Sequence, residues 1–133
     1  MKIKYKIWIE ENGKVIFGKG RDEILKLIEE KHSLNAAAKE LGMSYRAAWG
    51  RLKASEERME KKLVESSKPE KSLHLTEMAK AFIERFEKLE KDVENVLESA
   101  EKDLKKFFKD NEKKLWIWAF IGTLESLSRN LSF

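Results

Sequence analysis

The segment from Ser33 to Lys62 constrains the fold of this chain more than any other stretch, because its residues favour two helices joined by a tight turn. Ser33 is a favourable N-cap for a first short helix, and small apolar residues follow it at helical spacing. Gly42 ends that helix, and Ser44 can cap a second one. Two short helices with a small-residue turn between them predict a helix-turn-helix.

The second helix, at about residues 44–58, has two unlike faces. Small and apolar residues recur along its inward side at i, i+4 and i+7: Ala48, Leu52 and Ser55. At about 100° per residue, Arg46, Gly50 and Lys53 lie opposite them. That outward face is cationic and sterically open, as a helix entering the DNA major groove requires. The alternatives are a merely tolerated surface glycine at position 50 and a plain helical hairpin within a core.

Several strings in the first two thirds of the chain point to one group of proteins. They are Gly18, Gly20 and Arg21, the Ala36-Ala37 pair, the run Ser44-Tyr45-Arg46-Ala47-Ala48-Trp49, Leu63-Val64-Glu65, and Leu75-Thr76. With these residues, the chain resembles the N-terminal DNA-binding domain of molybdate-responsive (ModE-type) regulators, within the wider LysR-type winged-helix group. The run from Ser44 to Trp49 is its most specific part. The resemblance implies a winged helix-turn-helix that binds double-stranded DNA.

From the outward face and this resemblance we expect two sets of DNA contacts. Base contacts are expected from the second helix: Tyr45, Arg46, Trp49 and Lys53. Phosphate contacts are expected near the helix N-termini from Ser33, Asn35 and Ser44, and further from Arg51, Lys68 and Lys71.

After the second helix, the runs 63–65 and 73–75 are short enough to form the two strands of a wing, with residues 66–72 as its tip. The resembling family carries a glycine-rich wing, whereas this chain has Pro69 there and Met78-Ala79 shortly after the Leu-Thr pair. This difference puts the role of the wing in question. His74 alternates with leucines, so we expect it to face solvent or DNA.

Before the two helices, residues 1–11 alternate between apolar and mostly basic positions, which is typical of a strand. Asn12-Gly13 is a strong hairpin signal and would pair Ile9 with Ile16 and Trp8 with Phe17. We interpret residues 18–23 as a turn. A supporting helix follows, with an apolar stripe at Ile24, Leu25, Leu27 and Ile28.

Thr76 can cap a long helix at residues 76–109, whose apolar residues follow heptad spacing. These residues are Phe82, Phe86, Leu89, Val93, Val96 and Ala100, and the stripe then drifts to Leu104, Phe107 and Phe108. A charged helix cannot bury such a stripe alone. We expect a homodimer through this linker helix, and a fold-back onto its own domain is the alternative.

Asp110-Asn111 is interpreted as a boundary before a C-terminal helix at residues 111–130. Trp116, Phe120 and Leu124 there are expected to join the dimer contacts, although the segment could instead hold another protein. Its apolar run from Leu115 to Ile121 is far shorter than the roughly 20 residues of a membrane span, so no membrane contact is expected.

The charge lies mainly in the first half of the chain, where residues 1–62 hold 15 Lys and Arg against 10 Asp and Glu. Positive charge therefore coincides with the expected DNA-reading helices. The chain has no cysteine, which excludes disulfides and cysteine-based zinc sites, and no signal peptide is evident, so a cytoplasmic protein is expected. No nucleophile–base pair, metal cluster or phosphate loop is evident, so we expect no enzyme, cofactor or metal site.

The sequence thus predicts a mainly α protein with a small β component, in two parts: a winged helix-turn-helix at 1–75 and a helical dimerisation region at 76–133. Only about 40 residues follow the resemblance, so the family's oxyanion-binding domain, and with it molybdate sensing, is not expected. The expected function is transcriptional regulation by a DNA-binding homodimer. The alternative is a helical protein-interaction module that keeps the winged-helix fold without specific DNA binding.

Overall fold

A computed structural model describes residues 1–67 and 70–131, except for the side chains at 113–115 and 130–131. By its internal contacts the chain divides into two units. One unit is Tyr5–Lys91, which we call the winged-helix unit. The other combines Met1–Lys4 with the chain from Asp92 onward.

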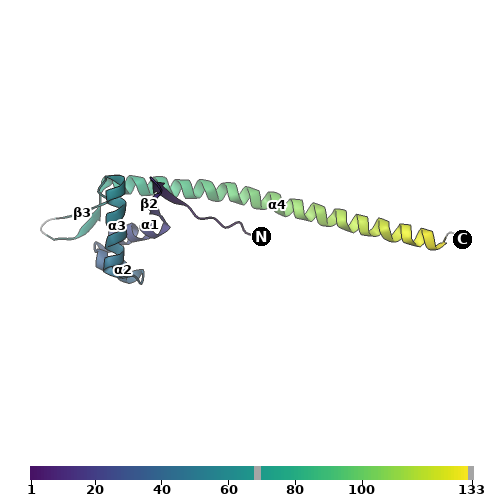
Figure 1. The fold of residues 1–133 in the computed structure, drawn as a ribbon, viewed down its shortest axis with the longest axis horizontal. Coiled ribbons are helices and arrows are strands. Elements are labelled where there is room, and N and C mark those ends of the chain that lie inside the picture. Colours follow the sequence, from purple (N-terminus) through teal and green to yellow (C-terminus); the bar gives the residue numbers. More distant parts are fainter. Residues whose placement is uncertain (68–69, 132–133) are drawn as a thin grey trace. The chain divides into compact units, whose positions relative to one another are not determined.

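The chain is mainly helical with two small antiparallel sheets, as predicted (Figure 1). Its elements, in order, are β1 (Trp8–Glu11), β2 (Lys14–Gly18), α1 (Lys19–Lys31), α2 (Leu34–Glu40), α3 (Tyr45–Met59), β3 (Val64–Ser66), β4 (Leu73–Leu75) and α4 (Glu77–Leu131). The N-terminal hairpin, the two-helix motif and the wing strands are all present.

The N-terminal hairpin turns at Asn12-Gly13 as predicted, and both residues have positive φ, as a type I′ turn requires. The predicted pairing is wrong by one residue, because a β-bulge lies between Ile9 and Glu10, and Ile9 pairs with Phe17 rather than with Ile16. The bulge lets two successive residues, Ile16 and Phe17, both point into the core. Local turn chemistry was therefore a good guide to the hairpin but not to its register.

The strand β1 begins only at Trp8, and the segment interpreted as a turn at 18–23 is mostly helix. Gly18 is the N-cap of α1, and a Cβ atom there would lie 3.2 Å from the Cβ of Trp8. The chain can therefore pass directly from β2 into α1 without a loop. Ile24, Leu25 and Ile28 form the buried stripe of α1 as predicted, and Leu27 is half-buried beside them.

The core of the winged-helix unit lies between α1, α2, α3, the wing and the first turns of α4. Phe17 from the hairpin packs edge-to-face against Phe82 and Phe86 of α4, with ring centroids 4.8 and 4.9 Å apart. Phe86 is only 3% exposed. The protomer's own hairpin therefore buries Phe86, which leaves it little surface for the predicted dimer seam, whereas Phe82 is half-buried and its place in the seam stays a prediction. The unit also extends to Lys91, beyond the predicted boundary at 75.

The helix α4 is continuous from Glu77 to Leu131, so the predicted break at Asp110-Asn111 is wrong. The amide of Asn111 donates to the carbonyl of Phe107 one turn earlier, at 2.9 Å, and so satisfies its side chain within the helix instead of ending it. In the second unit, the backbone N–H of Ile3 donates to Glu101 Oε1 at 2.8 Å. In the described part of the chain, no helix has the length and apolarity needed to cross a membrane.

Candidate nucleic-acid interface

The two-helix motif is held by a side-chain cap at the start of each helix. The Oγ of Ser33 accepts a hydrogen bond from the backbone N–H of Ala36, and the Oγ of Ser44 accepts one from Ala47, each at 3.1 Å. Both predicted N-caps are confirmed. Gly42 between the helices has φ of +66°, which is costly for any residue with a Cβ. Each capping hydroxyl keeps its own proton, so it can still donate to a phosphate oxygen.

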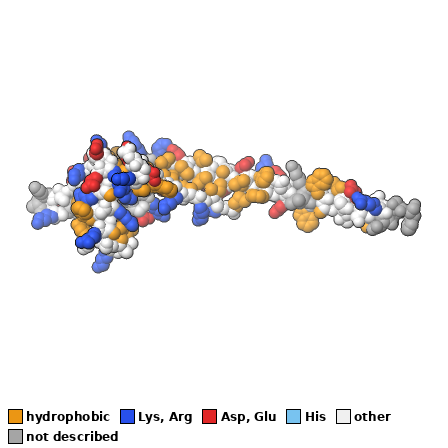
Figure 2. Space-filling model, in the orientation of Figure 1, with side chains coloured by type: hydrophobic (Ala, Val, Ile, Leu, Met, Phe, Trp, Pro, Cys, Tyr) orange, Lys and Arg blue, Asp and Glu red, His pale blue; other side chains and the backbone are white. Residues whose placement is uncertain are grey.

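The inward and outward faces of α3 are those that the spacing predicted. Ala48, Leu52 and Ser55 are buried against the core. On the outward side, Tyr45 is 51% and Trp49 46% exposed, and Arg46 is exposed between them. A Cβ at Gly50 would meet nothing within 4 Å, so this part of the helix is open. Figure 2 shows several Lys and Arg side chains on the face of the unit that α3 occupies in Figure 1.

Lys53 is less free than its outward position suggested. Its Nζ lies 2.9 Å from Glu56 Oε1 and 5.7 Å from the centre of the Trp49 ring. Its ammonium charge is thus shared between a carboxylate and an aromatic face. A base contact by Lys53 would have to compete with this ion pair.

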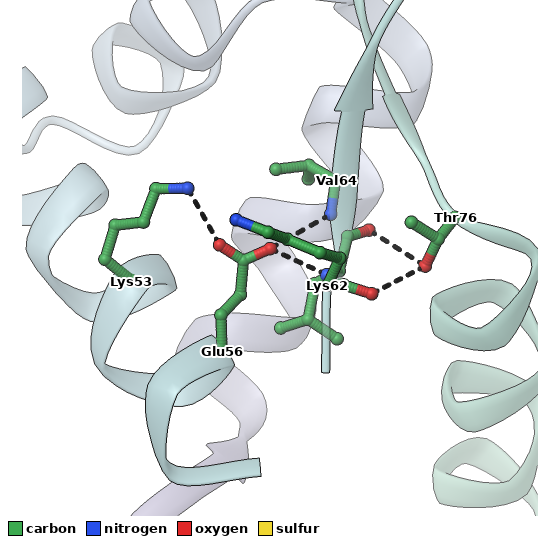
Figure 3. A network of polar contacts seen from close by, with 6 residues as sticks. Lys53, Glu56, Lys62, Val64 and Thr76 are labelled. Carbon is green, nitrogen blue, oxygen red and sulfur yellow. Dashed lines mark hydrogen bonds and ion pairs between the residues drawn. The ribbon is translucent and has the colours of Figure 1, made fainter. Parts of the chain in front are cut away.

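Glu56 joins α3 to the wing (Figure 3). Its Oε2 accepts hydrogen bonds from the backbone N–H of Leu63 at 2.7 Å and of Val64 at 3.4 Å, while Oε1 pairs with Lys53. Burial opposes ionisation of this carboxyl, but the hydrogen bonds from Lys53 and Leu63 outweigh it, so the pKa of Glu56 lies below its usual range. The carboxylate therefore stays charged and holds the first wing strand at the end of α3.

Thr76 fixes the other end of the wing (Figure 3). Its hydroxyl donates to the carbonyl of Lys62 at 2.9 Å and accepts from the N–H of Ala79 at 3.1 Å, and its N–H donates to the carbonyl of Leu63. The predicted cap of the long helix is confirmed. The same residue also joins the start of α4 to the segment that enters the wing.

The wing is a two-stranded antiparallel sheet in which Val64 pairs with Leu75 and Ser66 with Leu73. Its first strand is shifted by one residue from the predicted run at 63–65, because Leu63 is 1% exposed and belongs to the core. The tip closes through hydrogen bonds between Ser67 and Ser72. Lys71 is exposed there with φ of +53°, and the expected contacts of Lys68 and the departure at Pro69 lie outside the described residues.

His74 is half-buried, and its ring makes contacts that the alternation with leucines did not predict. Its Nε2 lies 2.8 Å from Ser72 Oγ, and its ring centroid lies 4.5 Å from that of His32, the C-cap residue of α1. The carbonyl of His32 also accepts from the N–H of Leu73 at 2.9 Å. The strand β4 therefore packs on the end of α1, where the rings of His74 and His32 meet. Among the described residues, no three His, Asp or Glu side chains cluster as a metal ion would need.

Residues 23–80 match the family described as "Bacterial regulatory helix-turn-helix protein, lysR family". This stretch of the winged-helix unit, from α1 to the start of α4, is therefore similar to the LysR-type helix-turn-helix family. That family consists of DNA-binding regulators and is not a family of enzymes. Among solved structures, one described as "Crystal structure of CbnR_DBD-DNA complex" is similar at 24% identity and a TM-score of 0.48, over 61% of this chain and 94% of that one. No curated protein matches the chain.

Several of the expected DNA-contacting residues are exposed in the winged-helix unit. Tyr45, Arg46, Trp49 and Arg51 are exposed on α3, and Asn35 is exposed on α2. Whether each of these side chains contacts DNA stays a prediction. The N-terminal hairpin and the first turn of α1 lie before the matched residues.

The polar contacts that hold the wing on the rest of the winged-helix unit were not predicted from the sequence. Glu56 could have been noticed, because it lies four residues after Leu52 on the inward face, where an acid needs a partner. Glu29 Oε2 accepts from the N–H of Leu75 at 3.2 Å, and this bond is the main reason why the pKa of Glu29 is lowered. Nothing in the local pattern of α1 indicates that contact, since its partner lies 46 residues away.

Proposed function

We propose that this protein is a transcriptional regulator that binds DNA as a homodimer, with α3 in the major groove. The observation that carries the proposal is the two-sided character of α3, which is capped at its start, buried on one side, and exposed on the other at Tyr45, Arg46 and Trp49. An open backbone at Gly50 favours close approach to the base edges. Arg46 can contact a guanine, and Tyr45 and Trp49 can pack on sugars or on thymine methyl groups.

The homodimer is supported by apolar side chains that are exposed on α4 from Leu89 onward. They include Leu89, Val96, Leu104 and Phe107, with Val93 half-buried among them. Figure 2 shows hydrophobic side chains following one another along this helix. Such a stripe favours pairing with a second helix of the same kind. Because Phe86 is buried in the protomer's own core and Phe82 packs against that core, the seam that we propose begins at Leu89.

A specific observation also favours the second candidate, a protein-interaction module. Trp116 is 77% and Trp118 70% exposed, and two positions on a helix that differ by two point to opposite sides. A seam between two helices covers only one side of α4, so another protein could bind the side that stays exposed.

Within the LysR-type group, the hairpin and the run from Ser44 to Trp49 favour the ModE-type branch as the finer assignment.

Selection of bound sites from random duplex DNA by the full chain tests the proposal. A DNA-binding homodimer should enrich a two-fold symmetric motif with half-sites about one helical turn apart, and its affinity should fall as salt rises. Enrichment of no motif, together with binding that salt does not change, would instead favour the protein-interaction module.

A further inference from the structure

The N-terminal hairpin and the start of α1 enclose an open cleft of about 290 Å³ that has a basic lining. Its charged lining residues are Lys6, Lys19 and Arg21, and no acidic side chain lines it. Trp8 forms one wall, with the Nζ of Lys6 lying 5.7 Å from the centre of the indole ring. We call this surface the hairpin cleft.

Two arginines of α3 continue the positive charge of the hairpin cleft toward the DNA-reading helix. A Cβ at Gly20 would lie 3.9 Å from Arg51 Nη1, so Arg51 borders the first turn of α1. Arg58 donates to the carbonyl of Val15 in β2. Arg51 follows Gly50 on α3, about 100° around the helix, so it lies between the open part of α3 and the first turn of α1 that it borders.

These cations lack the carboxylate partners that other lysines of the unit have. Lys26, Lys53 and Lys80 form ion pairs with Asp or Glu. Within residues 1–67 and 70–131, no such pair involves the cations of the hairpin cleft or its two neighbouring arginines: Lys6, Lys19, Arg21, Arg51 and Arg58. The surface therefore presents five cations without an ion pair, while one carboxylate, that of Glu10, accepts a hydrogen bond from the indole N–H of Trp8 at 2.9 Å.

Arg21 shows that this charge is crowded. Its Nε donates to the buried Ser55 Oγ, which fixes the guanidinium against α3. Burial, followed by the charges of Arg58 and Arg51, lowers the pKa of Arg21. An anion seated here would relieve that repulsion. The first turn of α1 adds to the attraction, because no side chain caps its N–H groups.

We infer that the hairpin cleft binds the phosphate backbone of the same duplex that α3 reads, just beyond the bases contacted by α3. The inference rests on the proposed function and deepens it by adding Lys6, Lys19 and Arg21 to the DNA-contacting residues. Phosphate is the expected ligand because the three charged residues among the described lining are all cations, beside one aromatic wall whose indole N–H is already bonded to Glu10. DNA is the expected source of that phosphate because Arg51 joins the cleft to the recognition helix. Such contacts add affinity without base preference.

The test is the salt dependence of DNA binding by the full chain. The variant Lys6→Ala/Lys19→Ala removes two exposed charges of the cleft, and Lys102→Ala/Lys109→Ala removes two exposed charges of α4 as a matched control. Each is titrated on a duplex that carries the selected site with one helical turn of flanking DNA, and on a scrambled duplex. Melting curves check that both variants stay folded.

In the cleft variant, we expect the slope of log affinity against log salt concentration to become shallower by about 1 to 2. Near 0.1 M salt, we expect its DNA affinity to fall about 5- to 10-fold for each phosphate contact that is lost. Both duplexes should be affected alike, and the control should behave as the wild type. An unchanged slope for the cleft variant, with normal binding by the wild type, would refute this inference alone. If the wild type bound neither duplex, the proposed function would fail and this inference with it.

A titration with inorganic phosphate tests whether the hairpin cleft binds a free phosphate ion instead of the phosphate of a DNA backbone. It is titrated into the wild type and Trp8→Phe, with tryptophan fluorescence as the readout. We expect no saturable Trp8-dependent change at low millimolar phosphate, because one backbone phosphate is held together with the rest of the duplex. A saturable Trp8-dependent change that also blocks DNA binding would show a free-anion site and overturn the assignment to DNA.

Discussion

Replacing Glu56 should destabilise the winged-helix unit far more than replacing its neighbour Glu57. The Glu56 side chain is 6% exposed and accepts the N–H of Leu63, whose own exposure is 1%. In Glu56→Ala that N–H stays buried without an acceptor, and Lys53 loses its partner. A buried unsatisfied donor and a lost charge-assisted hydrogen bond together cost about 2 to 4 kcal/mol.

The assay is thermal or urea unfolding followed by circular dichroism. For a domain of this size, a loss of about 3 kcal/mol corresponds to a fall in melting temperature of more than roughly 10 °C. Glu56→Gln keeps an oxygen that can accept from Leu63, so it should cost only about half as much. Glu57→Ala is the matched control, because Glu57 is exposed and should change stability by less than about 0.5 kcal/mol.

The same carboxylate predicts how stability depends on pH. Because the folded-state pKa of Glu56 is lowered, its contribution is complete above the unfolded value of about 4.3 and is lost as the pH falls through the folded pKa. The stability gap between wild type and Glu56→Gln should therefore be constant near neutral pH and narrow in acid. Equal losses for Glu56→Ala and Glu57→Ala, or a gap that widens in acid, would refute the proposed role of Glu56.

Four further predictions concern other parts of the chain. Arg46→Ala should lose about 1 to 3 kcal/mol of binding to the selected site and relax preference at one position, whereas Arg85→Ala on α4 should do neither in the same gel-shift titration. A protein that ends at Asn111 should keep the winged-helix unit, but its dimer should dissociate at micromolar concentration in sedimentation equilibrium. A tight dimer would instead show that the seam from Leu89 to Phe107 is sufficient for dimerisation. Asp22→Asn should raise the melting temperature at neutral pH but not in acid, because burial raises the pKa of Asp22 and its Oδ1 has no hydrogen-bond partner; a fall at neutral pH would contradict this. Molybdate or tungstate should not shift the melting temperature, and a saturable shift at micromolar oxyanion would be the contrary result.

The sequence alone determined the elements whose causes are local. Ser33 and Ser44 cap their helices through bonds to residues three positions ahead, and Asn12-Gly13 turns the hairpin within its own two residues. The buried face of α3 follows from spacing along a single helix. Such features depend on short-range geometry, so one sequence is enough to predict them.

Tertiary structure decided the features that depend on partners far along the chain. Phe82 and Phe86 carry heptad spacing that is equally compatible with a dimer seam and with an internal core, and only the position of Phe17 selects the core. The β-bulge before Glu10 is likewise set by the need to bury two successive residues of β2. A periodic pattern states that a face must be covered and does not state what covers it.

The candidate site divides in the same way. The exposure of Tyr45, Arg46 and Trp49 was predictable from helical angles, because an exposed face is simply the reverse of a buried one. The pairing of Glu56 with the amide of Leu63, the contact of His32 with His74, and the meeting of Arg51 with the start of α1 were not. Each joins elements that only the packed fold brings together, and polar partners leave no periodic signal in the sequence.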